Sequence, residues 1–193
     1  MKMIIIVSFV AILLPVATRA QNSKFKPHYV NHTEFGGLFG RVKFNFGNSE
    51  SQVDSKLSAT IQTFNGFQLT SRLATGLTVG MDWYKTALVN PLAAGIRYDL
   101  TARGPARLYA TLDAGYGVTW LHQDSDGYNT KGGMMLNPGI GLKYGKPGSN
   151  AFTISLSYKR QDVRVNKPLL WEQTYRLEER VYNRMALRIG MTF

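Results

Sequence analysis

The sequence predicts an all-β protein, an eight-stranded antiparallel up-and-down transmembrane β-barrel. Three observations support this prediction. Apolar and polar residues alternate with a period of two in several segments, turn-forming residues separate these segments, and glycine recurs on the polar face of the alternation. The clearest example is residues 107–121, RLYATLDAGYGVTWL, in which seven apolar residues alternate with polar residues and glycines.

The first twenty residues are excluded from the expected fold. They combine a basic start at Lys2 with an apolar run that is too short to span a bilayer, and small residues occupy the cleavage positions Thr18 and Ala20. This combination predicts a cleaved secretory signal peptide over residues 1–20. We expect residues 21–29 to form a periplasmic N-terminal segment and residues 30–193 to form the barrel.

The mature chain is basic and contains no cysteine. Without Lys2 and Arg19, 21 basic residues remain against 12 acidic ones, which gives a formal net charge of +9. Because an exported chain does not meet nucleic acid, we expect membrane lipid and an anionic surface glycolipid as its partners. The lack of cysteine excludes a lipoprotein anchor and a disulfide framework. No stretch of the mature sequence is apolar over eighteen residues, so strands must cross any membrane.

Eight segments carry the alternation, and the connections between them alternate in length. Short, turn-rich connections at one rim and longer polar connections at the other are typical of transmembrane barrels, with both termini on the periplasmic, short-turn side. The expected strands are 36–46, 56–69, 76–84, 91–101, 107–121, 135–145, 151–159 and 181–193. The expected longer connections are 47–55, 85–90, 123–132 and 165–179.

Two details of these strands are predicted from the residue types. In the first strand we expect Leu38, Phe44 and Phe46 on the apolar outer face and Phe39 on the opposite face. Because proline cannot donate to a strand ladder, we expect Pro138 at the first paired end of its strand or in a bulge.

A soluble barrel with an apolar interior would show the same alternation. Its polar face would then be in water, where Lys and Glu are common and glycine weakens a strand. Glycines interleaved with long charged side chains instead indicate a narrow lumen that side chains fill. The glycines on this face are Gly80, Gly95, Gly115, Gly117, Gly139, Gly141 and Gly190.

Charged residues on the same face predict a charge network in the lumen. An unpaired charge with little water is costly, so the basic and acidic side chains are expected to pair. Asp113 is interpreted as a counter-ion, with a catalytic or proton-relay carboxylate as the alternative. The predicted network consists of Arg41, Asp82, Arg97, Asp99, Asp113, Lys143, Arg184 and Arg188.

Aromatic residues on the apolar face lie near the ends of the strands. Rings are favoured there because hydrocarbon gives way to headgroups at that depth. The predicted aromatic girdle consists of Phe44, Phe46, Trp83, Tyr98, Trp120, Tyr144 and Tyr158.

Residues 65–84, 91–100, 109–121 and 136–145, with the terminal Phe193, resemble the small outer-membrane β-barrel proteins of Gram-negative bacteria. The resemblance is to the porin-like, OmpX or OmpA-transmembrane type and covers nearly all of the mature chain. It implies location in the outer membrane and insertion by the outer-membrane assembly machinery. It also implies that Phe193 serves as the assembly signal.

No catalytic residue, cofactor or metal site is predicted. A lipid-modifying enzyme in this membrane would need histidine and serine close together near the external rim. His122 has the required outward position, but Gln123 and Asp124 follow it instead of a serine, and His28 and His32 lie near the opposite rim. The segment that begins at Asp124, DSDGYN, lacks the bidentate glutamate of a calcium loop.

One loop is unusually apolar for a position that should be wet. We expect its apolar residues either to pack over the barrel mouth and contact headgroups or to form a partner-binding surface. These residues are Leu169, Leu170, Trp171 and Tyr175.

The predicted protein is a monomeric, non-enzymatic outer-membrane barrel with a structural or loop-mediated interaction role. Eight strands leave an interior just wide enough for side chains, which disfavours open diffusion of solutes. A narrow gated or ion-conducting pore is the alternative, and an outer-membrane lipid-modifying enzyme is less favoured.

Overall fold

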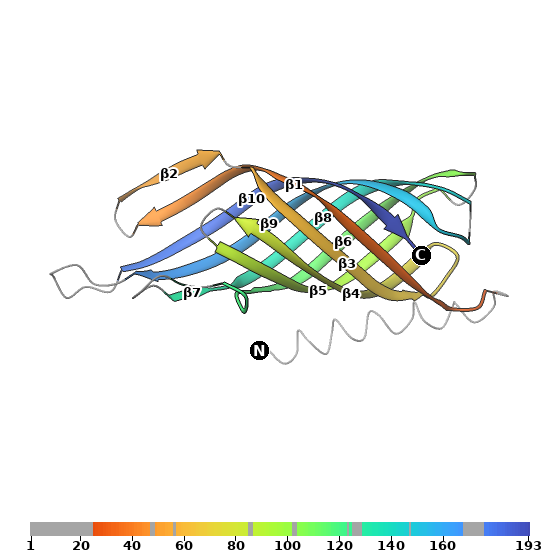
Figure 1. Cartoon of the computed structure of the whole chain (residues 1–193), viewed down its shortest axis with the longest axis horizontal. Helices are drawn as coiled ribbons and strands as arrows, with labels where there is room; N and C mark the ends of the chain where they lie inside the picture. The colour runs from red at the N-terminus through yellow and green to blue at the C-terminus, as the bar shows by residue number, and fades with distance from the viewer. Residues whose placement is uncertain are drawn as a thin grey trace, which may run out of the picture.

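The computed structural model describes residues 25–46, 49–55, 57–84, 87–101, 104–122, 124, 129–146, 148–167 and 176–193 (Figure 1). The side chains of residues 41–46, 49–55, 167 and 176–178 lie outside this description. No helix in the described residues is long and apolar enough to cross a membrane. The strands are β1 (His28–Phe46), β2 (Ser49–Ser55), β3 (Ser58–Gln68), β4 (Leu73–Tyr84), β5 (Ala87–Asp99), β6 (Ala106–Val118), β7 (Asn129–Lys131), β8 (Gly133–Tyr144), β9 (Ala151–Lys167) and β10 (Arg176–Thr192).

Eight of these strands form a closed antiparallel barrel. Their order around the barrel is β10-β1-β3-β4-β5-β6-β8-β9, and pairing of β9 with β10 completes the ring. The predicted eight-stranded up-and-down barrel is therefore confirmed. Strands four places apart in this order, such as β1 and β6 or β4 and β9, face each other across the interior.

The two ends of the barrel differ. The short connections at 69–72, 100–105 and 145–150 lie at the end that also holds the C-terminus, here named the turn end (Figure 1). At the opposite end, the loop end, β2 pairs with β1 and β7 pairs with β9. Two connections that were expected to be loops thus contain short strands, because the long barrel strands continue beyond the wall and offer free edges to pair with.

Several strand boundaries also differ from the prediction. β1 begins at His28, inside the segment that was expected to precede the barrel. β5 begins at Ala87, so most of the connection expected at 85–90 is strand. The connection expected at 165–179 is shorter, because Lys167 of β9 already pairs with Arg176 of β10.

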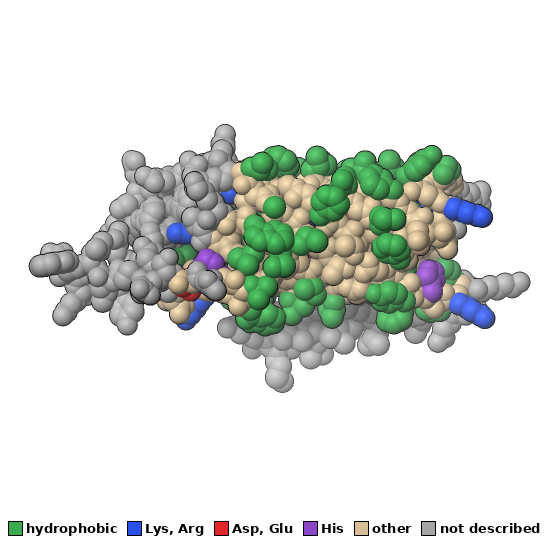
Figure 2. Space-filling view, in the orientation of Figure 1, with side chains coloured by type: hydrophobic (Ala, Val, Ile, Leu, Met, Phe, Trp, Pro, Cys, Tyr) green, Lys and Arg blue, Asp and Glu red, His purple; other side chains and the backbone are tan. Residues whose placement is uncertain are grey.

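The outer wall is apolar and the inner face is polar. Leu77, Leu112 and Leu187 are exposed on the wall, whereas the neighbouring Asp113 and Arg188 are buried inside. Figure 2 shows hydrophobic side chains spread over the wall, with Lys and Arg toward its ends. This distribution fits a wall in contact with hydrocarbon and a lumen filled by side chains.

The expected facing of the first strand is wrong. Leu38 is fully buried in the interior and Phe39 is 47% exposed on the wall. The cause is the register with β10, which places Leu38 opposite the buried Ala186 and Phe39 opposite the exposed Met185. Residues directly opposite in an antiparallel pair lie on the same face, so the neighbour fixes the facing of a strand whose own two faces are both apolar.

Pro138 lies in the interior of β8, not at a strand end or in a bulge. Because proline has no N–H to donate, the ladder with β9 is interrupted between the pairs Leu136–Arg160 and Gly139–Ser157, and the register is the same on both sides. Pro91 in β5 interrupts the ladder with β4 in the same way. The flanking pairs hold the register where the proline leaves a gap.

Glycine is required on the inner face where two strands approach closely. A β-carbon at Gly115 would collide with the backbone of Leu92 and Ala93 on β5.

We therefore expect Gly115→Val to lower the free energy of unfolding by about 2 kcal/mol or more. Ala114→Val, which places the same valine side chain on the exposed wall, should have little effect. Urea titration and comparison of boiled and unboiled samples on a gel check this, and equal stability of the two variants would contradict it.

Candidate functional site

The interior of the barrel contains a set of charged side chains. The structure places Asp82, Arg97, Asp99, Asp113, Lys143, Arg184 and Arg188 inside, and all seven are buried. Arg41, the eighth member of the predicted network, has its side chain outside the described residues. The contacts of the seven decide whether the lumen is open.

Asp113 lies at the centre of a saturated cluster. Its Oδ1 accepts hydrogen bonds from Arg97 Nη1 and Thr78 Oγ1, each at 2.7 Å. Its Oδ2 accepts from Asn137 Nδ2 at 3.1 Å and from Arg97 Nη2 at 3.3 Å. The Arg97 guanidinium also lies over the Phe64 ring, 4.4 Å from its centroid. With both oxygens occupied by donors from β4, β5 and β8, the geometry fits a structural counter-ion.

Asp82 and Lys159 connect opposite walls. Lys159 Nζ lies 2.5 Å from Asp82 Oδ2, and both side chains are essentially inaccessible to solvent. Thr60 Oγ1 donates to the other carboxylate oxygen at 2.7 Å, and Tyr84 OH donates to Oδ2 at 3.3 Å. Since β4 and β9 are four places apart around the ring, this ion pair crosses the full lumen. The sequence put Lys159 on the inward face but did not include it in the predicted network.

Glu34 is a second crossing point, which the sequence analysis missed. Its Oε1 accepts a hydrogen bond from Tyr109 OH at 3.0 Å, and its Oε2 accepts one from Gln62 Nε2 at 3.0 Å. Because Glu34 is on β1 and Tyr109 is on β6, the bond joins opposite walls. Val30, His32, Glu34 and Leu38 share the inward face, and the period-two pattern extended upstream of Gly36 could have identified it.

Apolar side chains fill the interior at the loop end. The rings of Tyr84 and Tyr182 are stacked with centroids 4.2 Å apart. The other buried members of this cluster are Leu38, Ala87, Val89, Val163, Val165 and Ala186. An apolar cluster inside a barrel that is otherwise polar excludes water from this end of the lumen.

Two arginines of β10 bond to neighbouring strands. Arg184 Nη1 donates to Gly40 O at 2.7 Å, and Arg188 Nη1 donates to Ser157 Oγ at 2.8 Å. Among the described residues, six cationic side chains and four carboxylates are buried. The six are Arg97, Lys143, Lys159, Arg180, Arg184 and Arg188.

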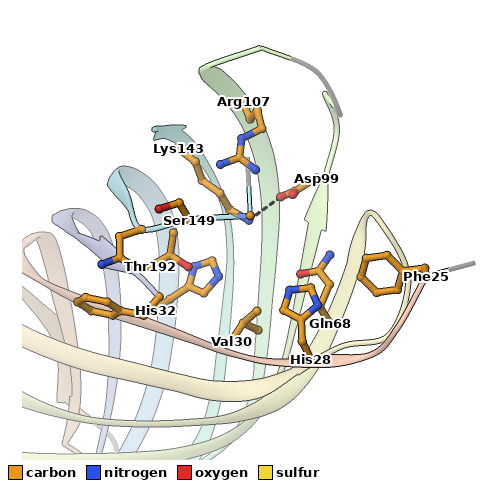
Figure 3. Close-up of a pocket in the computed structure, with 13 residues that line it drawn as sticks. Phe25, His28, Val30, His32, Gln68, Asp99, Arg107, Lys143, Ser149 and Thr192 are labelled. Carbon is orange, nitrogen blue, oxygen red and sulfur yellow. Dashed lines mark hydrogen bonds and ion pairs between the residues drawn. The ribbon is translucent and has the colours of Figure 1, made fainter. Parts of the chain in front are cut away.

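The turn end holds a cavity of about 250 Å³ (Figure 3). Lys143 Nζ bonds to Asp99 Oδ1 at 2.6 Å on one side of it, which joins β8 to β5. Arg107, His28 and His32 also line the cavity. The ion pair of Lys143 and Asp99 therefore forms the boundary between the charged lumen and the cavity.

The predicted aromatic residues with described side chains are all exposed. Trp83 and Trp120 lie toward the loop end, and Tyr98 and Tyr144 lie at the turn end. Tyr158 is followed on the same face of β9 by the exposed Arg160, which marks the limit of the apolar wall. The side chains of Phe44 and Phe46 lie outside the described residues. Further rings on the wall at the turn end are Tyr29, Phe67, Phe152 and Phe193.

A hydrogen-bonded polar ladder interrupts the apolar wall across β1 and β3, and the sequence did not predict it. Asn31 Nδ2 donates to Thr63 Oγ1 at 2.9 Å and to Asn65 Oδ1 at 2.8 Å. Thr33 Oγ1 donates to Asn31 Oδ1 at 2.9 Å, and Tyr29 OH donates to Asn65 Oδ1 at 2.5 Å. Because these groups bond to each other, they can face hydrocarbon without the full cost of unpaired polar groups.

His122 has both ring nitrogens engaged near the loop end. Its Nδ1 accepts a hydrogen bond from the Leu88 N–H at 3.2 Å, and its Nε2 lies 3.3 Å from Asp124 Oδ1. Asp124 in turn accepts bonds from the N–H and Oγ1 of Thr130. This arrangement fixes the connection between β6 and β7 to β5, and it leaves no nitrogen of the imidazole free to activate a nucleophile in this conformation.

The remaining predicted residues are placed as follows. Leu169, Leu170, Trp171 and Tyr175 lie outside the described residues. Phe193 is 54% exposed at the turn end, where its backbone pairs with Asn31.

Comparison with known proteins gives structural matches only. No protein-family model and no curated protein sequence matches the chain. The outer membrane protein OprG of Pseudomonas aeruginosa superposes with a TM-score of 0.56 at 13% identity, covering 89% of this chain and 97% of OprG. The N-terminal β-barrel domain of OprF, also from Pseudomonas aeruginosa, gives a TM-score of 0.50 at 17% identity, covering 86% of this chain and 97% of that domain.

At these identities the likeness concerns the fold. The fold is that of the small eight-stranded outer-membrane β-barrel proteins, as the resemblance in the sequence indicated. The superposition with OprG covers almost the whole length of both chains, so the likeness extends to the complete barrel.

The crossing ion pair makes a testable contribution to stability. Asp82→Asn leaves Lys159 as an uncompensated buried charge, and we expect it to lower the free energy of unfolding by about 3 kcal/mol or more. Asp82→Asn combined with Lys159→Met should recover most of that loss. The matched control is Asp162→Asn, because Asp162 forms an exposed ion pair with Arg160. Urea unfolding followed by tryptophan fluorescence measures the difference. If Asp82→Asn alone is as stable as Asp162→Asn, the stabilising role of the ion pair across the lumen is contradicted.

The contact between Asp124 and Thr130 predicts a pH dependence. Partial desolvation raises the pKa of Asp124, but the hydrogen bonds from Thr130 and the neighbouring His122 outweigh it and lower the pKa below its ordinary value. A lowered folded-state pKa means that the contact is present above the ordinary value and is lost as the pH falls through the lowered one. In an NMR titration the Thr130 amide shift should have a midpoint below about 3.9. The step should vanish in Asp124→Asn, and a midpoint at or above the ordinary value would refute the contact.

Proposed function

We propose that the mature chain is an integral outer-membrane barrel with a closed lumen, which stabilises the membrane or presents its loops to partners. The observation that carries this proposal is the pair of contacts between opposite walls, from Lys159 to Asp82 and from Tyr109 to Glu34. A side chain from each wall meets the other at two positions along the barrel, so the space needed for a diffusing solute is filled. The stacked Tyr84 and Tyr182 close the loop end in addition.

The environment of the protein forms part of the proposal. Residues 1–20 direct export and are cleaved, and the apolar wall with its terminal aromatic rings suits the outer membrane of a Gram-negative cell. The exposed Phe193, which directly follows β10, supports recognition by the assembly machinery. The net charge of +9 on the mature chain favours contact with anionic lipid and glycolipid, and a monomer satisfies all barrel strand edges by itself.

A narrow ion-conducting pore is the second candidate. The buried Arg188 favours it, because its Nε and Nη2 have no hydrogen-bond partner and a lumen cation of this kind can interact with a passing anion. Conduction would require the two contacts between opposite walls to open.

Recording from planar bilayers in concentrated potassium chloride separates the two functions. A closed lumen predicts no steady openings for the native chain. Replacing Glu34, Tyr109, Asp82 and Lys159 by alanine removes both contacts between the walls, and adding Tyr84→Ala removes the ring stack at the loop end. This combined variant should produce openings or leak. Asn183→Ala, which changes an outward residue that bonds to Tyr158, is the control and should remain silent. Steady openings of the native chain would overturn the closed-lumen proposal in favour of the pore.

A further inference from the structure

The cavity at the turn end has no part in the closed lumen described above. Its volume of about 250 Å³ is enough for several water molecules or one small anion, since a water occupies about 30 Å³ in the liquid. In Figure 3 Arg107, Lys143, His32 and Thr192 surround it, and these residues come from β6, β8, β1 and β10. The cavity is therefore built by strands from several parts of the ring.

Arg107 is a cation that lacks a counter-charge at this end. It lies directly opposite Lys143 in the register of β6 and β8, an arrangement in which like charges repel. Asp99 is already bonded to Lys143, and Arg107 forms no ion pair with any carboxylate in the described part of the chain. Its Nε is buried without a hydrogen-bond partner. The guanidinium therefore has free donors and an unbalanced charge beside the cavity.

His32 supplies a second, independent feature. Its side chain is 3% exposed and lines the cavity, and its Nδ1 is buried without a hydrogen-bond partner. The ring is held edge-on to Phe64 and to Tyr109, with centroids 5.6 and 6.0 Å away. A buried polar atom without a partner costs free energy that a bound ligand would recover.

Asp99 is the carboxylate side chain among the residues that line the cavity, and it is already bonded to Lys143. In a low-dielectric cleft the unbalanced charge of Arg107 concentrates anions.

We propose that the turn-end cavity binds a small oxyanion with a phosphate group, held by Arg107 and His32. Arg107 offers a planar fork of donors that matches phosphate oxygens, and the Lys143 ammonium retains two protons after bonding to Asp99. His32 donates in the tautomer that carries its proton on Nδ1. A tetrahedral oxyanion has enough acceptors for all three groups at once. The phosphate is either free inorganic phosphate or part of a lipid headgroup.

Calorimetric titration of the full mature barrel tests this binding. The protein is folded in a maltoside detergent without phosphate, and inorganic phosphate is titrated at constant ionic strength, with chloride as the reference anion. Arg107→Gln should weaken phosphate binding at least about tenfold, as expected for the loss of a charged hydrogen bond. His32→Gln should also weaken it, and the shift between boiled and unboiled samples verifies that each variant is folded. If His32→Gln does not fold, Arg107→Gln decides the test alone.

The matched control is Arg160→Gln. It removes the same charge from an exposed position on the outer wall of β9, toward the other end of the barrel, and should bind phosphate as the native chain does. A parallel titration with short-chain phosphatidylglycerol distinguishes the two sources. Binding of the lipid without binding of inorganic phosphate assigns the site to a headgroup, whereas binding of inorganic phosphate shows that the free ion suffices. The proposal is overturned if neither probe binds, or if Arg107→Gln binds as tightly as Arg160→Gln.

Discussion

Compensation of charge inside a narrow barrel is the constraint on which the structure depends. Eight strands enclose a space that side chains nearly fill, so each inward carboxylate must find its partner within the wall or across the lumen. Asp82 reaches the Lys159 cation on the opposite strand, and Glu34 accepts a hydrogen bond from the Tyr109 hydroxyl across the lumen. Glycine follows from the same constraint, because a β-carbon at Gly115 has no space beside Leu92 and Ala93.

A polar interior also determines which face of each strand points outward. Apolar residues of similar volume could fill the lumen with no loss of stability, but both faces of every strand would then be apolar. A shift of register by one residue exchanges the two faces, and only the contrast between them opposes that shift. The polar interior therefore helps to specify the register in a fold whose outer surface is mostly apolar. The loop end is the exception. There Leu38, Val163 and Tyr182 form an apolar interior, and the paired strands around it extend beyond the wall.

This contrast explains what could be predicted from the sequence. Where polar and apolar residues alternate cleanly, as around Leu112 and Asp113, the expected facing agrees with the structure. In β1 the apolar pair Leu38 and Phe39 carries no contrast, and the facing is set by β10, about 150 residues later in the sequence. The position of Pro138 within its strand was predicted wrongly. The pairs on either side of it keep the register although proline lacks an N–H donor, and the sequence does not reveal these pairs.

The partners inside the lumen were less predictable than the facing. Arg97 and Asp113 lie on the inward faces of adjacent strands. Their contact could therefore be predicted from the sequence, because inward charges on neighbouring strands are expected to pair. Lys159 and Asp82 are far apart in sequence and on opposite strands, and their meeting depends on the strand order and the tilt of the whole ring. The apolar residues of the loop at 168–175, which the sequence singled out, lie outside the described residues, so their role stays a prediction.

Electron paramagnetic resonance of single nitroxide labels tests the orientation and the filling of the lumen together, and the natural lack of cysteine makes each label unique. Labels at Leu112 and Leu187 should collide with oxygen dissolved in the lipid. Labels at Ala93 and Ser157 should collide with neither oxygen nor a water-soluble nickel chelate, because packed side chains surround both positions. Free access of the nickel chelate to Ala93 and Ser157 would show a water-filled channel and contradict the closed, charge-compensated interior.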